Sequence, residues 1–177
     1  MFAAAAIGVG LWQVHGMGAG LAVTQAHVGN IPLTVFRQPG AGPAPVVVVA
    51  HGFAGSQQLM QPFATTLARN GYVAVTFDFP GHGRNPQPLS GGLADFSAMQ
   101  RDLLDTLDAV SRHAVGLDGS DGRLAVLGHS MAADVVVRYA DANPEVQATV
   151  AVSLFLPRPE EFHPRNLLII DGALEAG

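Results

Sequence analysis

The sequence predicts an α/β fold, in which a mostly parallel sheet has helices on both faces and an antiparallel hairpin at its N-terminal end. Three observations support this prediction. The four consecutive valines Val46–Val49 are typical of a strand buried on both faces. Strand-like and helix-like stretches then alternate along the chain. Finally, residues 124–133 combine a short apolar strand, a tight turn and the start of a helix.

The elements follow one another without a linker that would divide the chain. A hairpin is predicted from strands 21–28 and 33–38, joined at Gly29-Asn30. In the first helix we expect Leu59, Phe63 and Leu67 to form the buried face. The further strands are predicted at 46–50, 72–79, 124–129, 148–155 and 166–170, and the helices at 57–70, 95–113 and 131–142, the second helix with an apolar stripe of Phe96, Met99, Leu103, Leu107 and Val110.

The composition excludes several classes of function. The chain has 177 residues, of which 49% are hydrophobic and 13% charged, so it can bury a substantial core as one domain. The net charge is −5, and the nine basic residues are scattered arginines, so no nucleic-acid partner is expected. The chain has no cysteine, which excludes disulfides and a thiolate nucleophile. The histidines lack metal-ligand spacing and no nucleotide motif is present, so we expect neither a metal nor a cofactor.

The first 20 residues form an apolar, glycine-rich leader, and the first charged side chain is Arg37. We interpret residues 1–20 as the remnant of a signal peptide or N-terminal anchor whose start has been lost, although a flexible apolar leader is the alternative. This interpretation favours a secreted, periplasmic or membrane-anchored protein over a cytoplasmic one. It also predicts membrane association of the full-length protein through its N-terminus.

Three short motifs follow three of the predicted strands. The first is HGFAGS at 51–56, the second DFPGHGRNP at 78–86, and the third GHSMA at 128–132. In the third, Ser130 stands at a strand-to-helix turn between Gly128 and Ala132, which is the G-x-S-x-G pattern with its last glycine replaced by alanine. The alternative for Ser130 is an ordinary serine that caps the helix after it.

In this order the three motifs resemble those of the α/β-hydrolase superfamily, over roughly residues 25–177. The resemblance implies an esterase-like, lipase-like or dienelactone-hydrolase-like serine hydrolase, with Ser130 as the nucleophile at a nucleophile elbow. It implies an oxyanion hole formed by the backbone N–H groups of Phe53 and Met131. The substrate-binding residues would be His51, Gly52, Phe53 and His129.

The catalytic acid and base are less clearly marked. By the same resemblance, the acid follows the last predicted strand as Glu175, with Asp171 as second choice; both can also be simple turn carboxylates. In this fold the catalytic histidine follows the acid, yet only Ala176 and Gly177 follow Glu175. No catalytic histidine is therefore identified. We interpret residues 21–177 as an α/β-hydrolase core that lacks its C-terminal part, in a chain truncated at both ends.

Three hypotheses about function follow. The first is hydrolysis of small or medium carboxylic esters through an acyl-enzyme, with Phe53, Leu59, Met60 and Met131 around the site. The second is a catalytically incomplete fragment, or a non-catalytic paralogue that binds a ligand or a partner. The third is a homo-oligomer in which two chains cover the sheet edge left after the last strand. For His82, local hydrogen bonding is expected, and a metal role together with Asp78 is the alternative.

Overall fold

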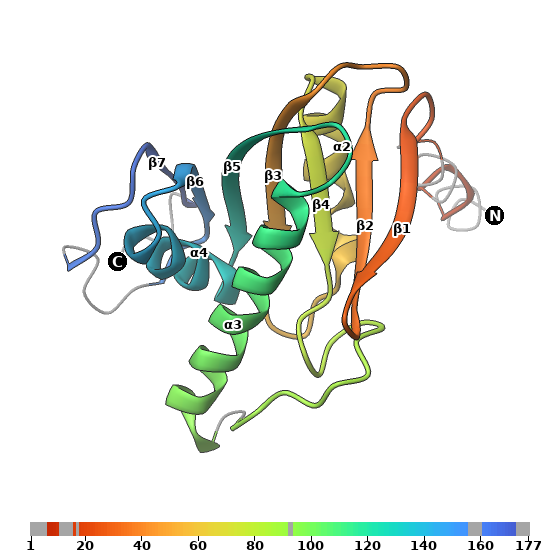
Figure 1. The fold of residues 1–177 in the computed structure, drawn as a ribbon. Helices are drawn as coiled ribbons and strands as arrows, with labels where there is room; N and C mark the ends of the chain where they lie inside the picture. The colour runs from red at the N-terminus through yellow and green to blue at the C-terminus, as the bar shows by residue number, and fades with distance from the viewer. Residues whose placement is uncertain (1–6, 11–15, 17, 92–93, 156–160, 173–177) are drawn as a thin grey trace.

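One seven-stranded sheet organises the described part of the chain (Figure 1). The structure is a computed structural model that describes residues 7–10, 16, 18–91, 94–155 and 161–172. The strands are β1 (Ala22–Val28), β2 (Ile31–Arg37), β3 (Ala44–Ala50), β4 (Val73–Phe77), β5 (Ser120–His129), β6 (Val146–Val152) and β7 (Leu167–Ile170). The helices are the 3₁₀ turn η1 (Gln57–Met60), α2 (Gln61–Arg69), α3 (Phe96–Val115) and α4 (Met131–Ala142).

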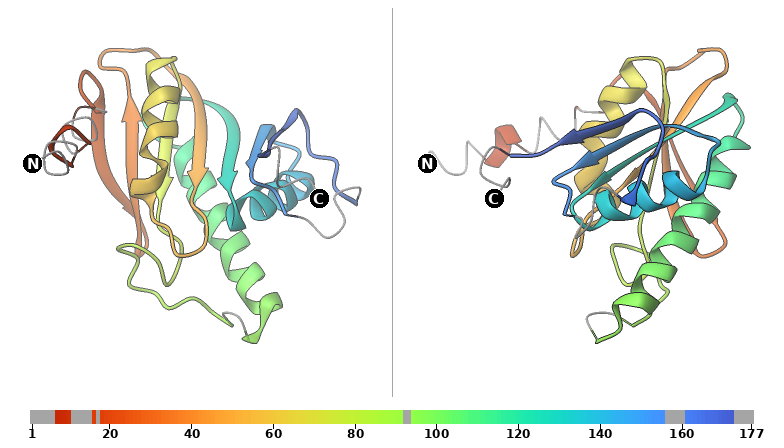
Figure 2. Two further views of the ribbon diagram at one scale, coloured as in Figure 1. Left: turned by 180° about the vertical axis from the view of Figure 1, so that it is seen from behind. Right: turned by 90° about the vertical axis from the view of Figure 1, so that its left-hand side faces the viewer.

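The sheet is mostly parallel, as predicted. Its strand order is β1-β2-β4-β3-β5-β6-β7. β2 runs antiparallel to both β1 and β4, and the remaining pairs are parallel. α3 and α4 cover one face while α2 covers the other, as the two opposite views show (Figures 1 and 2). The predicted fold class, including the N-terminal hairpin, is confirmed.

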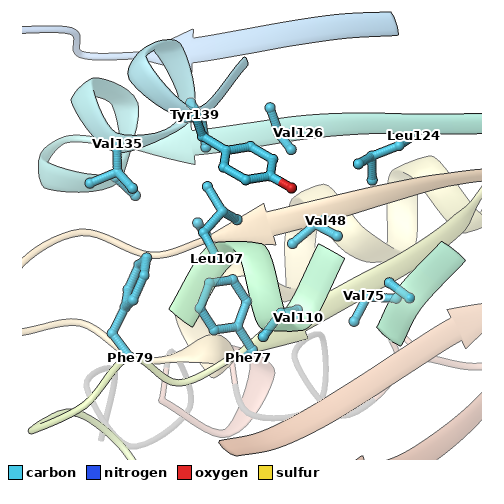
Figure 3. Packing of buried hydrophobic residues seen from close by; sticks show 14 of the residues in the cluster. Val48, Val75, Phe77, Phe79, Leu107, Val110, Leu124, Val126, Val135 and Tyr139 are labelled. Atoms are coloured by element: carbon cyan, nitrogen blue, oxygen red, sulfur yellow. The ribbon is translucent and has the colours of Figure 1, made fainter. Parts of the chain in front are cut away.

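The four valines of β3 fill the core on both faces of the sheet. Val46 and Val48 pack in the large cluster beneath α3 and α4, which Figure 3 shows in part. Val47 and Val49 pack on the opposite face with Met60. All four side chains are buried, so the valine run is explained by a central strand between two layers of helices.

The predicted buried face of the first helix is wrong at Leu59 and Phe63, whereas Leu67 is half-buried and packs against the core as predicted. The residues that face the sheet are Met60, Ala64 and Ala68, which lie one position beyond the predicted stripe. Leu59 and Phe63 are exposed at 67% and 36%. Both stripes have helical spacing, and the structure buries the one with small alanines because α2 packs closely on Phe36 and Ala74.

The second helix follows its predicted stripe except at the start. Met99, Leu103, Leu107 and Val110 are buried, but Phe96 is 64% exposed. α3 begins at Phe96, and its first turns extend beyond the ends of the strands (Figure 1). The N-terminus of the helix is capped by Asp95, whose side chain accepts a hydrogen bond from the Ala98 N–H at 3.0 Å.

Most of the predicted leader, residues 1–20, lies outside the described residues. Within the described ranges, each helix is too short or too polar to cross a membrane. β5 begins at Ser120, four residues before the predicted strand, because the chain at Gly119 and Ser120 already pairs with Ala44.

Candidate active site

Ser130 occupies a strained turn between β5 and α4. Its backbone has φ 54° and ψ −120°, a conformation that residues other than glycine seldom adopt. The Ser130 N–H donates to the Val152 carbonyl at 2.9 Å, and its own carbonyl accepts from the Ala133 N–H at 2.8 Å. The side chain makes no cap hydrogen bond to α4, so the capping interpretation of Ser130 is wrong. The residue is exposed above the sheet.

Small residues on both sides of Ser130 make this turn feasible. A Cβ atom on Gly128 would collide with the carbonyl group of Ala132 and lie 2.9 Å from the Ala133 nitrogen. The last strand residues and the first turn of α4 therefore approach to backbone contact. Ala132 is itself completely buried, and its side chain is a single methyl group.

The loop after β3 brings the Gly52 backbone against Ser130. A Cβ atom on Gly52 would lie 3.0 Å from the Ser130 Cβ and 3.1 Å from the His129 carbonyl oxygen. The loop then turns back, with the Gly55 N–H donating to the Gly52 carbonyl at 3.0 Å. Phe53 at the tip of this turn is 55% exposed. The structure thus brings Gly52, Phe53, His129 and Ser130 together at the carboxyl ends of the parallel strands β3 and β5.

His51 is a structural residue of this loop. Its Nε2 accepts a hydrogen bond from the Phe79 N–H at 3.1 Å, so we assign the ring proton to Nδ1, which donates to the Gly52 carbonyl at 2.8 Å. Burial lowers the pKa of His51 below its usual 6.5. Both ring nitrogens are used, so His51 ties the first motif to the second and is not placed to accept a proton from Ser130.

Asp78 holds the second motif from inside. Its carboxylate accepts from the Gln57 N–H at 2.7 Å, from Gln57 Nε2 at 2.9 Å and from the Arg84 N–H at 3.0 Å. A side chain at Gly83 would collide with this carboxylate. Asp78 is completely buried, and its hydrogen bonds join the loops that follow β3 and β4.

His82 is hydrogen-bonded locally, as predicted. Its Nδ1–H donates to the Pro80 carbonyl at 2.8 Å. Its ring lies against the rings of His51 and Phe53, with centroids 5.2 and 5.7 Å away. Over the described ranges, no three histidine, aspartate or glutamate side chains form a cluster that could hold a metal ion.

No described histidine forms a hydrogen bond with Ser130. The backbone N–H of His163 donates to Asp141, which lies near the far end of α4 from Ser130. Of the two candidate acids, Glu175 lies outside the described residues. Asp171 directly follows β7, and its Oδ1 accepts from the Leu154 N–H at 2.9 Å. Asp171 and Ser130 thus both follow the carboxyl ends of parallel strands, β7 and β5, which are two positions apart in the sheet.

A pocket of about 510 Å³ opens beside Ser130. This volume is within the usual range for small-molecule sites, about 300–1,000 Å³. Phe53 and Met131 line it as predicted, but Leu59 and Met60 do not. Met60 is buried on the opposite face of the sheet. Residues of α3 line the pocket instead. The lining residues are Phe53, Phe96, Ser97, Met99, Gln100, Leu103, Ser130, Met131, Asp134, Val135, Arg138, Ser153 and Phe155.

A polar group in the pocket wall was not predicted from the sequence. Arg138 Nε donates to Asp134 Oδ2 at 2.9 Å, and Gln100 Nε2 lies 3.4 Å from the same oxygen. The Arg138 guanidinium also lies over the Phe162 ring, 4.6 Å from its centroid. The i,i+4 spacing of Asp134 and Arg138 was a visible signal for the pair, but nothing in the spacing indicated a pocket.

The family model for serine aminopeptidase, S33, matches residues 41–169, which include all three motifs and Ser130. The chain belongs to this S33 family. The fold agrees, since the structure resembles solved α/β-hydrolases. It matches a thioesterase domain from the curacin biosynthetic pathway with a TM-score of 0.60 and 27% identity, covering 77% of this chain and 46% of that one. It matches the Pyrobaculum calidifontis esterase with a TM-score of 0.59 and 22% identity, covering 80% and 48% of the two chains.

Two bacterial proteins are among the curated sequences similar to the S33 chain. A Yersinia pestis protein, provisionally named a carboxymethylenebutenolidase, is 26% identical in an alignment 161 residues long, which covers 82% of this chain and 60% of that protein. The bis(hydroxyethyl) terephthalate hydrolase of Streptomyces coelicolor is 32% identical over 134 residues, or 75% of this chain and 39% of that enzyme. The chain therefore spans less than two thirds of the length of these relatives.

Proposed function

We propose that this S33 chain carries the nucleophile and substrate pocket of a serine hydrolase that cleaves carboxylic esters through an acyl-enzyme. The observation that carries the proposal is Ser130 itself. It is exposed in a strained strand-to-helix turn, faces a pocket of about 510 Å³ and touches the Gly52 backbone. Strain of this kind persists where the surrounding structure enforces it, as Gly128 and Ala132 do here.

In the proposed reaction, Ser130 Oγ attacks the ester carbonyl carbon while its proton passes to a base. The carbonyl oxygen gains the charge, and the carbon–oxygen bond to the alcohol then breaks as the alcohol takes up the proton. Water hydrolyses the acyl-enzyme by the same steps. The backbone N–H groups of Phe53 and Met131 are the proposed donors to the developing oxyanion.

The positions of these two residues support their role. Met131 is the first residue of α4, so its N–H has no partner inside the helix. The positive end of the helix dipole favours negative charge at the same place. Phe53 directly follows Gly52, whose backbone contacts Ser130. For the acid we propose Glu175, with Asp171 as the alternative, and the base is a histidine that the described residues do not supply.

Covalent labelling tests the role of Ser130. We would incubate the folded chain with a fluorophosphonate probe and locate the adduct by mass spectrometry. The Ser130→Ala variant should lose the label, whereas Ser97→Ala, which changes another exposed serine of the same pocket, should keep it. A label that persists in Ser130→Ala would refute the assignment of the nucleophile.

The second candidate function is binding without catalysis. It is favoured by one observation, namely that no histidine within the described ranges is hydrogen-bonded to Ser130. In that case the wild-type chain should fold, keep its pocket and remain unlabelled, because an unactivated serine reacts poorly near neutral pH.

A further inference from the structure

The pocket beside Ser130 is a trough between two helices. One wall begins at Ser130, directly before α4, and continues along α4 with Met131, Asp134, Val135 and Arg138, whose spacing places them on one face of the helix. On α3 the trough is lined by Phe96, Ser97, Met99, Gln100 and Leu103. Ser130 and Arg138 are eight residues apart, so the trough runs about 12 Å along the helix at 1.5 Å per residue.

Most of this trough is apolar. Met99, Leu103 and Val135 are buried in its walls. Phe53, Phe96 and Phe155 lie around it with their side chains more than half exposed. Exposed aromatic rings that line a concave surface are typical of a site that binds an apolar group, because a ligand covers them from water.

The far end of the trough is polar, and its accessible group is a hydrogen-bond donor. The Arg138 side chain is 26% exposed, and within the described residues only its Nε is hydrogen-bonded, to Asp134. The stacking on Phe162 and the bond to Asp134 hold the guanidinium in place. Asp134 Oδ1 is inaccessible and has no partner among the described residues, so it cannot serve a ligand in the trough. The guanidinium has four further N–H donors on its two terminal nitrogens.

We propose that this trough binds one extended arm of the ester substrate, about 12 Å long, with an apolar stem and an acceptor oxygen at its far end that bonds to Arg138. The acceptor is a carboxylate or a carbonyl oxygen, which share this chemistry. The proposal rests on the proposed function, since it takes Ser130 as the point from which the arm extends. Arg138 is then a specificity-determining residue, with Asp134 as its positioning residue.

Three esters with stems of the same length test the proposal. Methyl octanoate ends in a methyl group, dimethyl suberate in an ester carbonyl and monomethyl suberate in a carboxylate. Binding would be titrated by ligand-observed NMR on the full chain carrying Ser130→Ala, so that no turnover interferes. We expect at least one of the two suberates to bind about tenfold more tightly than methyl octanoate, because a hydrogen bond to a charged group is worth a factor of this size. A preference for the half-ester alone identifies a carboxylate, and a preference for both identifies a carbonyl.

Variants of two matched arginines locate the effect. Arg138→Gln should abolish the preference for the suberates and leave methyl octanoate unchanged. The control is Arg112→Gln on α3, which removes the same i,i+4 pair with aspartate, here Asp108, at a position outside the pocket. It should leave all three affinities unchanged. Arg138→Gln should also keep the thermal unfolding midpoint close to that of the Arg112→Gln chain.

Equal binding of the three esters to the chain with intact Arg138 would overturn the proposal, and so would a suberate preference that survives Arg138→Gln. Release of methanol by the chain with intact Ser130 reports hydrolysis separately. Binding without methanol release favours the second candidate function, binding without catalysis, and leaves the trough assigned. Methanol release without a preference for the suberates supports the proposed function and overturns the assignment of the trough.

Discussion

At the residue scale, the turn at Ser130 depends on the absence of a side chain two positions earlier. The Ala132 carbonyl occupies the place that a Cβ atom of Gly128 would take. Because this neighbour is backbone, it cannot move aside without displacing the start of α4. The geometry of Ser130 therefore depends directly on the size of residue 128.

Gly128→Ala should destabilise the fold by about 3 kcal/mol, because one extra methyl group meets fixed backbone atoms. Urea unfolding measures this change. Gly42→Ala is the control, since a Cβ atom at Gly42 meets nothing within 4 Å and its φ lies outside the left-handed region. Equal unfolding midpoints for the two variants would contradict the close approach at Gly128.

His51 gives the fold a specific sensitivity to acid. Its pKa is lowered in the fold because burial disfavours the charged ring. Between that lowered pKa and 6.5 the unfolded chain binds more protons than the folded chain, so stability falls as the pH drops below 6.5. His51→Gln should weaken this dependence, because Gln does not titrate. Unfolding free energies at pH 7.5, 6.5 and 5.5 for both chains measure it, and parallel curves would contradict the role of His51.

At the scale of elements, the loops after β3 and β4 act as one unit. Asp78 receives two hydrogen bonds from Gln57 and one from Arg84. The loop after β3 also carries Gly52 and Phe53 to Ser130. The position of the proposed oxyanion donor therefore depends on a carboxylate that lies outside the pocket.

Asp78→Asn should cost about 3 kcal/mol in unfolding free energy, because an amide cannot accept all three of these hydrogen bonds and one N–H donor is left buried. Urea unfolding provides the measurement. Asp105→Asn, at an exposed position of α3, should change the stability by less than about 0.5 kcal/mol. A loss of similar size in both variants would show that charge alone, and not the hydrogen bonds of Asp78, is responsible.

The two helical faces differ in what they contribute. Leu107 of α3 is completely buried in the main core, whereas Leu59 of η1 is mostly exposed. Leu107→Ala should therefore cost about 2–5 kcal/mol through the cavity that it leaves. Leu59→Ala should cost less than about 0.5 kcal/mol. Thermal and urea unfolding compare the stabilities of the two variants. Equal losses of stability would contradict the exposure of Leu59 and support the buried stripe that was predicted from the sequence.

Several of these features could be predicted from the sequence, because they are encoded locally. Strand and helix positions follow from the valine run, the helical spacing and the residues at helix ends. The face of α2 could not be predicted in this way, because two stripes with the same spacing compete and only the distance between helix and sheet decides. The trough was missed because it depends on how α3 and α4 cross. The tautomer of His51 likewise depends on Phe79, 28 residues away.

At the scale of the whole molecule, the two edges of the sheet are unlike. β7 at one edge consists of Leu167, Leu168, Ile169 and Ile170, each at least 36% exposed. β1 at the other edge contains polar residues such as Thr24, Gln25 and His27. An exposed apolar edge strand is a template for pairing with another chain, whereas polar residues discourage it.

We therefore expect this chain to associate through β7 as its concentration rises. Ile169→Lys should shift the onset of association to higher concentration, since a charge at the edge opposes pairing. Light scattering over a concentration series measures the mass. Val23→Lys is the matched control at the β1 edge, where the side chain is similarly exposed, at 47% against 44%. If both lysines act alike, net charge and not the β7 edge governs association.

The central position of β3 has a consequence for synthesis of the chain. β3 pairs with β4 on one side and with β5 on the other, and β5 begins at residue 120, 70 residues after the end of β3. At a translation rate of 5–20 residues per second, the interval is about 4–14 s. During this time the nascent chain presents a valine-rich strand with one open side. The strand at the centre of the finished sheet is thus open to wrong pairing while the chain is still at the ribosome.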